Sequence, residues 1–538
     1  MIKQLTLILV WSAMLAVPAT LTAQTESRIS TPQDRRALFN YLLDKTLERE
    51  AFSPIKNQRL GLDVEKAMRA FENEIVAAST ESELFYALVK LSNARKDRHL
   101  TVSAIDGGLR PDPNYSSSAN SNYPDLDAAE QEPPTAPIRF AVDFSQAPNH
   151  FSLFVADLGD QFREDAGGLR SGLIVTGIND LSISDFVSRV RPYFRYSTEN
   201  GFWTKLAQAL HQRTPILPRS FYRGHLDLRL SDGRGQNSTV SLPYISAQTI
   251  VWQGISRRKY SEFQLIRSGE VFDLYRHRAR KVLLISWKGF GDALIEEIDS
   301  LMEWASKAQL LDYNLVWDGT RSRGGGQGAY AIQRLSPKPF KTTFGNLRLS
   351  DVVPEFVDGK RRQFKADGMS DGVRETIDDG SWLMEWLEGD VMQGLAAGQA
   401  YSNDVPFKTA HAPAWSDGRL NPTKVHFRGE MVCLFGPYGG SHLDQFAAIV
   451  IDNGLCTTLG MPAGGYSNTW EWEEDVRFPL SNEPVVKFMW SIGHTIRPNG
   501  QILEGNPAEV DEFLPLTREN YRHYHDRLLA RALKVLER

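Results

Sequence analysis

The sequence predicts an α/β fold for the C-terminal half of the chain, because apolar stretches of strand length alternate there with amphipathic helical stretches. The predicted elements follow one another as strand 282–287, helix 292–307, strand 315–317, strand 431–435, helix 441–452 and strand 455–459. Strands that are separated by helices pair in parallel, so we expect these strands to form one sheet with helices packed against it.

Two regions at the N-terminal side differ in character from this core. Residues 30–105 have a helical pattern, in which Leu84, Leu88 and Leu91 recur on one helix face. Residues 106–137 are rich in Gly, Ser and Pro and poor in large apolar side chains. Such a segment cannot bury enough surface to fold alone, so it is expected to be a flexible linker.

A β-rich domain is expected between the linker and the core. Residues 138–245 contain short alternating runs separated by turn residues, which is typical of antiparallel strands. The core is expected to span 246–538, with a polar insert at 340–429 and a closing amphipathic helix at 518–536.

Composition and charge exclude several classes of protein. The 538 residues are 41% hydrophobic and 24% charged, as in ordinary globular proteins. The net charge of −5 is too small for bulk attraction to nucleic acid or to an anionic membrane to be the main activity. The two cysteines, Cys433 and Cys456, exclude a disulfide-rich scaffold and a Cys-based metal cluster. Their positions leave open whether they pair or remain buried free thiols.

The first residues predict export. Lys3 precedes an apolar stretch at 5–21, and Leu21-Thr22-Ala23 forms a cleavage site before a polar run. We therefore expect residues 1–23 to be a signal peptide and the mature protein to be secreted or periplasmic, without stable membrane insertion. The alternative is an uncleaved membrane anchor, since the apolar stretch is almost long enough to span a bilayer.

A serine at the start of a predicted helix is the strongest chemical signal in the chain. A predicted strand is followed by Gly439 and Gly440, which allow a sharp turn, and then by Ser441. In that place the hydroxyl projects beside backbone N–H groups that the helix leaves unpaired, and such donors stabilise an oxyanion. The alternative is that Ser441 and Asp444 form a capping box. The segment is not the Gly-x-Ser-x-Gly elbow of α/β-hydrolases, because Leu443 occupies the place of its second glycine.

A second glycine run, at 318–326, follows the predicted strand 315–317. A backbone N–H of this run could complete an oxyanion hole, whereas the simpler interpretation is a tight turn. No Gly-Lys-Ser/Thr follows the run, which argues against a phosphate-binding loop.

In this order, the two segments resemble those of the C-terminal-processing (tail-specific) serine peptidase family, which includes the tricorn-type core. Four further stretches are similar to that family: 281–292 to the strand that opens its core, 459–465 to a glycine-rich strand end, 499–511 to its closing Glu-Gly motif, and 91–99 to a helix ending in Asp-x-His. The resemblance implies a crotonase-like ββα spiral core, preceded by the helical N-terminal segment and a PDZ-like β-rich domain.

The resemblance also implies which residues react. One version of the family pairs the serine with a lysine beyond the following helix, but Tyr466 stands there and the next lysine is Lys487. The other version uses a histidine from the N-terminal region and a glutamate near the C-terminus, and these positions are His99 and Glu504. Ser441 is then the nucleophile, His99 the general base and Glu504 the acid that orients it.

The same resemblance places the oxyanion hole at the backbone N–H groups of Gly325 (or Gly324) and His442. His494 is a rival candidate for the base. No metal and no other cofactor is implied.

These residues lead us to expect an extracytoplasmic serine peptidase that cleaves polypeptides through an acyl-enzyme. The alternative is a non-catalytic protein of the same fold that binds an apolar ligand or a peptide, and a third possibility is a hydrolase of non-peptide esters. A short distance between His99 and Ser441 favours the peptidase, whereas an apolar cavity with His99 pointing away favours the binding protein.

Overall fold

The computed structural model describes residues 29–111, 133–162, 168–255, 260–367, 381–406, 417–468 and 470–537. The predicted signal peptide and most of the predicted linker lie outside these residues. None of the helices in the described ranges has the length and apolar character that crossing a bilayer requires.

A seven-stranded sheet forms the centre of the C-terminal half, in the order β21-β17-β16-β11-β10-β9-β8. Its strands are β8 (Phe263–Ser268), β9 (Phe272–His277), β10 (Val282–Trp287), β11 (Asn314–Asp318), β16 (Met431–Phe435), β17 (Thr457–Gly460) and β21 (Glu512–Phe513). The pairs from β10 to β21 are parallel, and β8 and β9 add an antiparallel edge. The mixed α/β class predicted from the sequence is confirmed.

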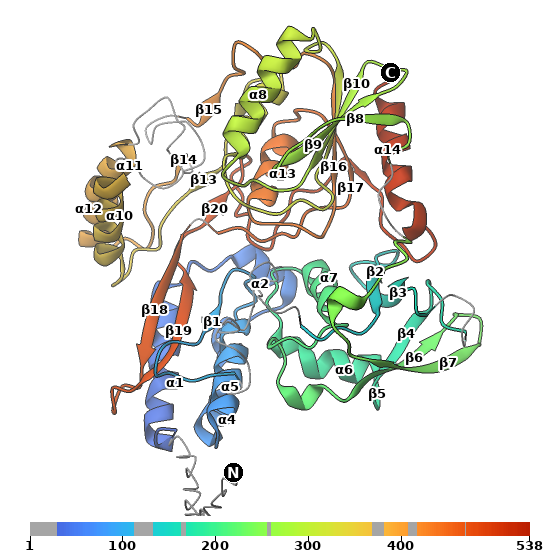
Figure 1. The fold of residues 1–538 in the computed structure, drawn as a ribbon. Coiled ribbons are helices and arrows are strands. Elements are labelled where there is room, and N and C mark those ends of the chain that lie inside the picture. Colours follow the sequence, from blue (N-terminus) through green and yellow to red (C-terminus); the bar gives the residue numbers. More distant parts are fainter. Residues whose placement is uncertain are drawn as a thin grey trace, which may run out of the picture.

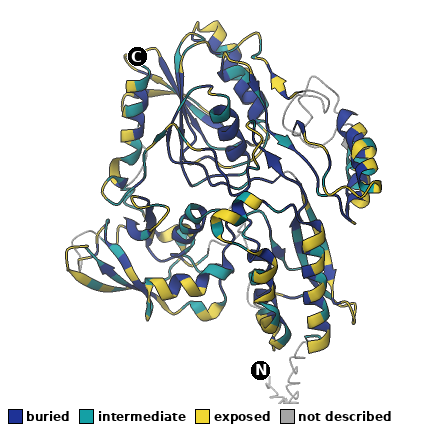
Figure 2. Cartoon of the chain, turned by 180° about the vertical axis from the view of Figure 1, so that it is seen from behind, coloured by how far each residue is buried: buried dark blue, intermediate teal, exposed yellow. Residues whose placement is uncertain are grey.

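Helices cover both faces of this sheet (Figure 1). The covering helices are α8 (Leu294–Lys307), α9 (Gly328–Leu335) and α13 (His442–Asp452) on one face and α14 (Tyr524–Val535) on the other. Alternate side chains of β10 serve the two layers: Leu283 and Ile285 pack toward α8 and α13, and Leu284 packs toward α14. Because both faces are buried, the central strands are continuous apolar runs, and Figure 2 shows them as buried.

The two cysteines meet between neighbouring strands of this sheet. Cys433 on β16 is buried, Cys456 lies just before β17, and their sulfur atoms are 3.4 Å apart as free thiols.

The N-terminal helices pack with strands from the other end of the chain. The helices are α1 (Pro32–Arg49), α2 (Pro54–Leu60), α3 (Val64–Arg69), α4 (Glu72–Ala77) and α5 (Glu81–Asn93). They are followed by β1 (Val102–Ser103), which pairs with β19 (Pro484–Ser491), and β19 pairs with β18 (Glu471–Arg477). This pairing brings the segment around residue 99 to the C-terminal half of the chain (Figure 1).

A separate sheet lies between the linker and the core, in the order β2-β3-β4-β6-β7, with β5 paired to β4. Its strands are β2 (Ile138–Asp143), β3 (Ser152–Leu158), β4 (Ile174–Ile178), β5 (Leu181–Ser182), β6 (His225–Ser231) and β7 (Asn237–Pro243). The same region contains the helices α6 (Ile183–Val190) and α7 (Glu199–Ala209) and the 3-10 turns η2 (Arg191–Tyr193), η3 (Arg219–Phe221) and η4 (Ala247–Thr249). All of its pairs are antiparallel.

The insert forms short strands and a helical group at the side of the molecule, near β18 (Figure 1). Its elements are β12 (Phe340–Lys341), β13 (Phe344–Gly345), α10 (Val353–Asp367), α11 (Ser381–Trp386), the π-helical turn η5 (Leu387–Val391), α12 (Met392–Ala396), β14 (Val405–Pro406) and β15 (Arg419–Leu420). β13 pairs with β20 (Thr495–Ile496), which ties the insert to the chain just before Glu504. A 3-10 turn, η6 (Tyr521–His523), precedes α14.

Candidate active site

Ser441 occupies a strained turn between β16 and α13. Its backbone has φ +60° and ψ −120°, a region that residues other than glycine rarely adopt and that costs about 1–3 kcal/mol. The Ser441 N–H donates to the carbonyl oxygen of Tyr466 at 2.8 Å. Its hydroxyl makes no capping hydrogen bond to the described helix α13, so the structure does not adopt the capping-box alternative. The hydroxyl is therefore held away from its own helix.

The turn needs glycine immediately before the serine. A Cβ at Gly440 would lie 2.1 Å from the Tyr466 ring, far inside van der Waals contact. Tyr466 thus fills the space beside the turn and accepts the Ser441 N–H, and any larger residue at 440 would displace both.

His99 reaches this serine from the N-terminal region. Its Nε2 atom lies 3.2 Å from Ser441 Oγ, although the two residues are 342 positions apart. The backbone on either side of the imidazole is fixed: the His99 N–H donates to Asp97 Oδ1 at 2.9 Å, and Arg195 donates to the His99 carbonyl at 3.2 Å. The ring also makes an edge contact with Tyr466, with 5.2 Å between centroids. A base and a hydroxyl therefore stand in hydrogen-bonding range.

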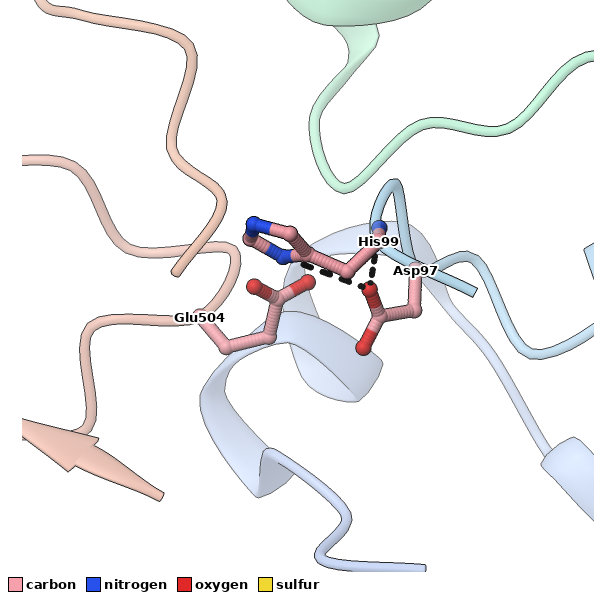
Figure 3. A group of neighbouring side chains, drawn as sticks. All are labelled: Asp97, His99 and Glu504. Atoms are coloured by element: carbon pink, nitrogen blue, oxygen red, sulfur yellow. Dashed lines mark hydrogen bonds and ion pairs between the residues drawn. The ribbon is translucent and has the colours of Figure 1, made fainter. Parts of the chain in front are cut away.

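Two carboxylates lie on the other side of the imidazole (Figure 3). One ligand atom each of Asp97, His99 and Glu504 lies within 4.8 Å of the others. Both acids are almost completely buried, at 2% and 1% relative exposure. Glu504 Oε2 accepts the Ser467 N–H at 2.9 Å, and the Glu504 carbonyl accepts the Ser53 hydroxyl at 2.7 Å.

The two acids differ in their affinity for protons. Burial, together with the negative charge of Asp97, raises the pKa of Glu504 to about 8. Burial also acts to raise the pKa of Asp97, but the positive charges of Lys56 and His99 and the hydrogen bonds it accepts hold that pKa below its usual value. Asp97 therefore gives up its proton more readily than Glu504, whose pKa lies near 8.

A buried ammonium group completes the cluster. Lys56 Nζ lies 3.6 Å from Glu504 Oε1, and its side chain is 4% exposed. Asp97, His99 and Glu504 are the one group among the described residues with the spacing of a metal site. Because Lys56 already supplies a cation there, the arrangement is suited to acid–base chemistry.

The predicted oxyanion-hole segments also meet at the serine. A Cβ at Gly324 would lie 2.8 Å from Ser441 Cβ, so this backbone lies against Ser441. Gly325 has φ +140° and forms an isolated parallel β-bridge with Phe290. The two hydrogen bonds of this bridge run from the Phe290 N–H to the Gly324 carbonyl and from the Gly326 N–H to the Phe290 carbonyl, so the Gly325 N–H takes no part in it. His442 opens α13, next to Ser441.

His494, the rival base, is engaged elsewhere. Its Nε2 atom lies 3.1 Å from the Phe52 carbonyl oxygen, and its ring stacks on Tyr401. Burial lowers the pKa of His494. His99, rather than His494, is the histidine that contacts Ser441.

Three residues of the site carried no decisive signal in the sequence. Asp97 was visible only as part of the Asp-x-His motif, and Lys56 is an unremarkable lysine in a polar helical stretch. Asp444 entered the sequence analysis only as the partner in the alternative capping box, whereas its carboxylate accepts the N–H groups of Gly465 and Tyr466 at 2.9 and 3.0 Å. These contacts join residues distant in the sequence, which local patterns do not report.

No family model and no curated protein matches the sequence. Solved structures do match: mature CPAF superposes with a TM-score of 0.64 at 14% identity, over 94% of this chain and 96% of that chain. CPAF in complex with lactacystin gives the same score, and a serine-to-alanine mutant of CPAF gives 0.63 at 13% identity, each over 94% of this chain and 98% of the other. The chain has a fold similar to that of CPAF.

A weaker match is the photosystem II D1 C-terminal processing protease, with a TM-score of 0.38 at 10% identity over 90% of this chain and 94% of that chain. Another is the tricorn protease, with a TM-score of 0.34 at 12% identity over 95% of this chain and 38% of that chain. The expected resemblance to this group of proteins is confirmed at the level of the fold, on the match to CPAF.

Proposed function

We propose that the chain is a serine peptidase that cleaves polypeptides through an acyl-enzyme. The observation that carries the proposal is the 3.2 Å distance between His99 Nε2 and Ser441 Oγ. Serine is a weak nucleophile at its own pKa and needs an adjacent base. The fold shared with CPAF supports the proposal, as does the resemblance of the sequence motifs to the tail-specific serine peptidase family.

In the proposed reaction, Ser441 Oγ attacks the carbonyl carbon of a peptide bond while its proton passes to His99 Nε2. The tetrahedral oxyanion is stabilised by backbone N–H groups of Gly325 (or Gly324) and His442. The imidazolium then gives its proton to the leaving amine, and an ester of Ser441 remains. A water molecule, activated by the same histidine, hydrolyses this ester and restores the serine.

The acids stabilise the charged form of the base. When His99 takes the proton, its positive charge faces the carboxylates of Asp97 and Glu504 within the buried cluster. The charge attraction is stronger there than in water, because the carboxylates are shielded from solvent. Glu504 is proposed as the orienting acid, in its ionised form, with Asp97 as a second acid beside it.

We also propose the finer assignments of fold and location. The α/β core is of the crotonase-like type, and residues 138–245 form a PDZ-like domain. Domain boundaries follow the expected ranges 30–105, 106–137, 138–245 and 246–538. The chain acts outside the cytoplasm, on the evidence of the signal-like residues 1–23.

The non-catalytic alternative is less well supported. A protein that only carries a ligand has no need for an imidazole within hydrogen-bonding range of a strained serine. Those two features are what the site provides.

The test is hydrolysis of an unfolded polypeptide, such as denatured casein, by the purified protein. We expect cleavage by the wild type and by the exposed-site controls Ser306→Ala and His523→Ala, and a loss of at least about 10³-fold in Ser441→Ala and His99→Ala. Unchanged turnover in Ser441→Ala would overturn the proposal. Hydrolysis of small esters without any peptide cleavage would instead identify an esterase.

A further inference from the structure

A buried ammonium group, that of Lys56 in helix α2, faces the candidate site. Lysine is almost never fully buried unless it is paired. Lys56 is nevertheless only 3% exposed as a residue, and its partner within reach is Glu504, with 3.6 Å between Nζ and Oε1. A buried ion pair beside a candidate base therefore needs an explanation other than solubility or surface charge.

The local structure holds Lys56 against the loop that carries Glu504. The Ser53 hydroxyl caps α2 by accepting the Lys56 N–H at 3.2 Å and donates to the Glu504 carbonyl at 2.7 Å. The next residue, Gly505, has φ +70°, and a Cβ there would lie 2.4 Å from Lys56 Cβ. The first turn of α2 and the Glu504 loop are thus fitted to one another at two points.

Among the charged groups around Lys56, Arg95 pairs with Glu50, so the positive charge of Lys56 offsets the negative charges of Glu504 and Asp97. The groups whose charges interact with Lys56 are the carboxylates of Glu50, Asp97 and Glu504 and the imidazole of His494. The guanidinium of Arg95 and the imidazole of His99 interact in turn with these acids. Arg95 is committed to Glu50 at 2.9 Å and to the Met489 carbonyl at 2.9 Å. With all three acids ionised and both cations present, the cluster has a charge of −1, which one proton on His99 neutralises.

We infer that Lys56 is a positioning residue for the proposed reaction: its ammonium group favours the ionised form of Glu504 and holds it in place, so that the carboxylate can stabilise the His99 imidazolium. The inference rests on the proposed function. Lys56 acts through Glu504 and does not touch the reacting atoms. Without the ammonium group, Glu504 faces the negative charge of Asp97 in a buried site and retains its proton to a higher pH.

The experiment compares the wild type with Lys56→Met, Lys56→Arg and the exposed control Lys66→Met. The rate at which a fluorophosphonate probe labels Ser441 is measured from pH 5.5 to 10. We expect Lys56→Met to move the acid limb of the profile upward by at least one pH unit, to slow labelling at pH 7 at least tenfold, and to recover toward the wild-type rate at high pH. Lys56→Arg should return the limb toward its wild-type position, and Lys66→Met should match the wild type.

A merely structural role would lower the rate by the same factor at every pH, and that result, or an unshifted limb in Lys56→Met, would overturn the inference. A second measurement does not depend on activity: the unfolding midpoints of Lys56→Met, Glu504→Gln and the double variant. We expect the double variant to lose less than the sum of the single losses, because Glu504→Gln removes the charge that Lys56→Met leaves uncompensated. Additive losses would show that the two residues are not coupled and would also overturn the inference.

Failure of the proposed function gives a different result. In that case the wild type itself is not labelled at Ser441, and the role of Lys56 in a reaction falls with it, whatever the unfolding cycle shows.

Discussion

The backbone N–H of Ser441 donates a 2.8 Å hydrogen bond to the carbonyl oxygen of Tyr466, the residue at the position where one version of the family that the sequence resembles carries a lysine. The Tyr466 ring also contacts His99, with 5.2 Å between centroids, and the Arg98 guanidinium lies 4.3 Å from its centre. One residue thus contacts both Ser441 and His99, the proposed nucleophile and base.

This relationship predicts the effect of shortening the Tyr466 side chain. Tyr466→Ala removes the ring contact to His99 but keeps the backbone carbonyl. Labelling of Ser441 by a fluorophosphonate should slow about tenfold, equivalent to ~1.4 kcal/mol, which is within the range of an edge-to-face ring contact. Tyr466→Phe keeps the ring and should stay within about twofold of the wild type. Equal rates in the alanine variant would show that the ring does not hold the base.

The raised pKa of Glu504 predicts an alkaline preference. With a pKa of about 8, Glu504 is mostly protonated at pH 7 and ionised at pH 9, so the labelling rate should rise about tenfold between them. Glu504→Gln should abolish this rise. A rate that is flat from pH 7 to pH 9 in the wild type would contradict the requirement for an ionised Glu504.

The same shift predicts how stability depends on pH. Glu504 has a pKa of about 8 in the folded protein and about 4.5 when unfolded, so between these pH values the folded state binds more protons than the unfolded state. The contribution of Glu504 to the free energy of unfolding therefore falls as pH rises from about 4.5 to 8. Unfolding curves in urea should therefore show a steeper decline over this window in the wild type than in Glu504→Gln. Parallel curves would indicate that Glu504 is not perturbed.

Asp444 is predicted to hold the two loops of the site together. Its buried carboxylate accepts the N–H groups of Gly465 and Tyr466, and burial raises its pKa to about 7. Asp444→Ala leaves both donors unpaired and should lower the free energy of unfolding by about 2–4 kcal/mol. The exposed control Asp44→Asn should change it by less than about 0.5 kcal/mol. A similar, small loss in both variants would show that the Asp444 carboxylate does not hold the two loops together.

The strained backbone of Ser441 predicts a trade of stability against activity. At φ +60° and ψ −120°, glycine is relaxed and alanine is not. Ser441→Gly should therefore be more stable than Ser441→Ala by about 1 kcal/mol in chemical denaturation, and neither should be labelled. If alanine is as stable as glycine at this position, the turn is not strained in solution.

The sequence predicted the central strands with the bounds that β10 and β16 have, because a strand buried on both faces is a continuous apolar run. The predicted end points of other elements were less accurate, because side-chain and tertiary hydrogen bonds set where those elements begin. The closing helix, expected from 518, begins at Tyr524, since Thr517 and Asn520 form turn hydrogen bonds before it. The region 30–105, expected to be helical, ends in a short strand, Val102–Ser103, which pairs with β19 from the other end of the chain.

The residues of the candidate site also fall into two groups, those that the sequence could predict and those that it could not. Ser441 could be predicted because a strand, two glycines and a helix adjoin it in sequence, and His99 and Glu504 because their motifs resemble those of a known family. Lys56 and the true partners of Asp444 could not be predicted. Their roles arise from contacts between residues far apart in the chain, and neither leaves a periodic or local pattern.

The proposed roles of Ser441 and His99 are tested by mapping, by mass spectrometry of peptides, the site and extent of fluorophosphonate labelling in the wild type and in His99→Ala. We predict one adduct, on Ser441, in the wild type and at least about 10³-fold slower labelling in His99→Ala. An adduct on a different residue, or equal labelling of Ser441 without His99, would contradict the assignment of these two residues as nucleophile and base.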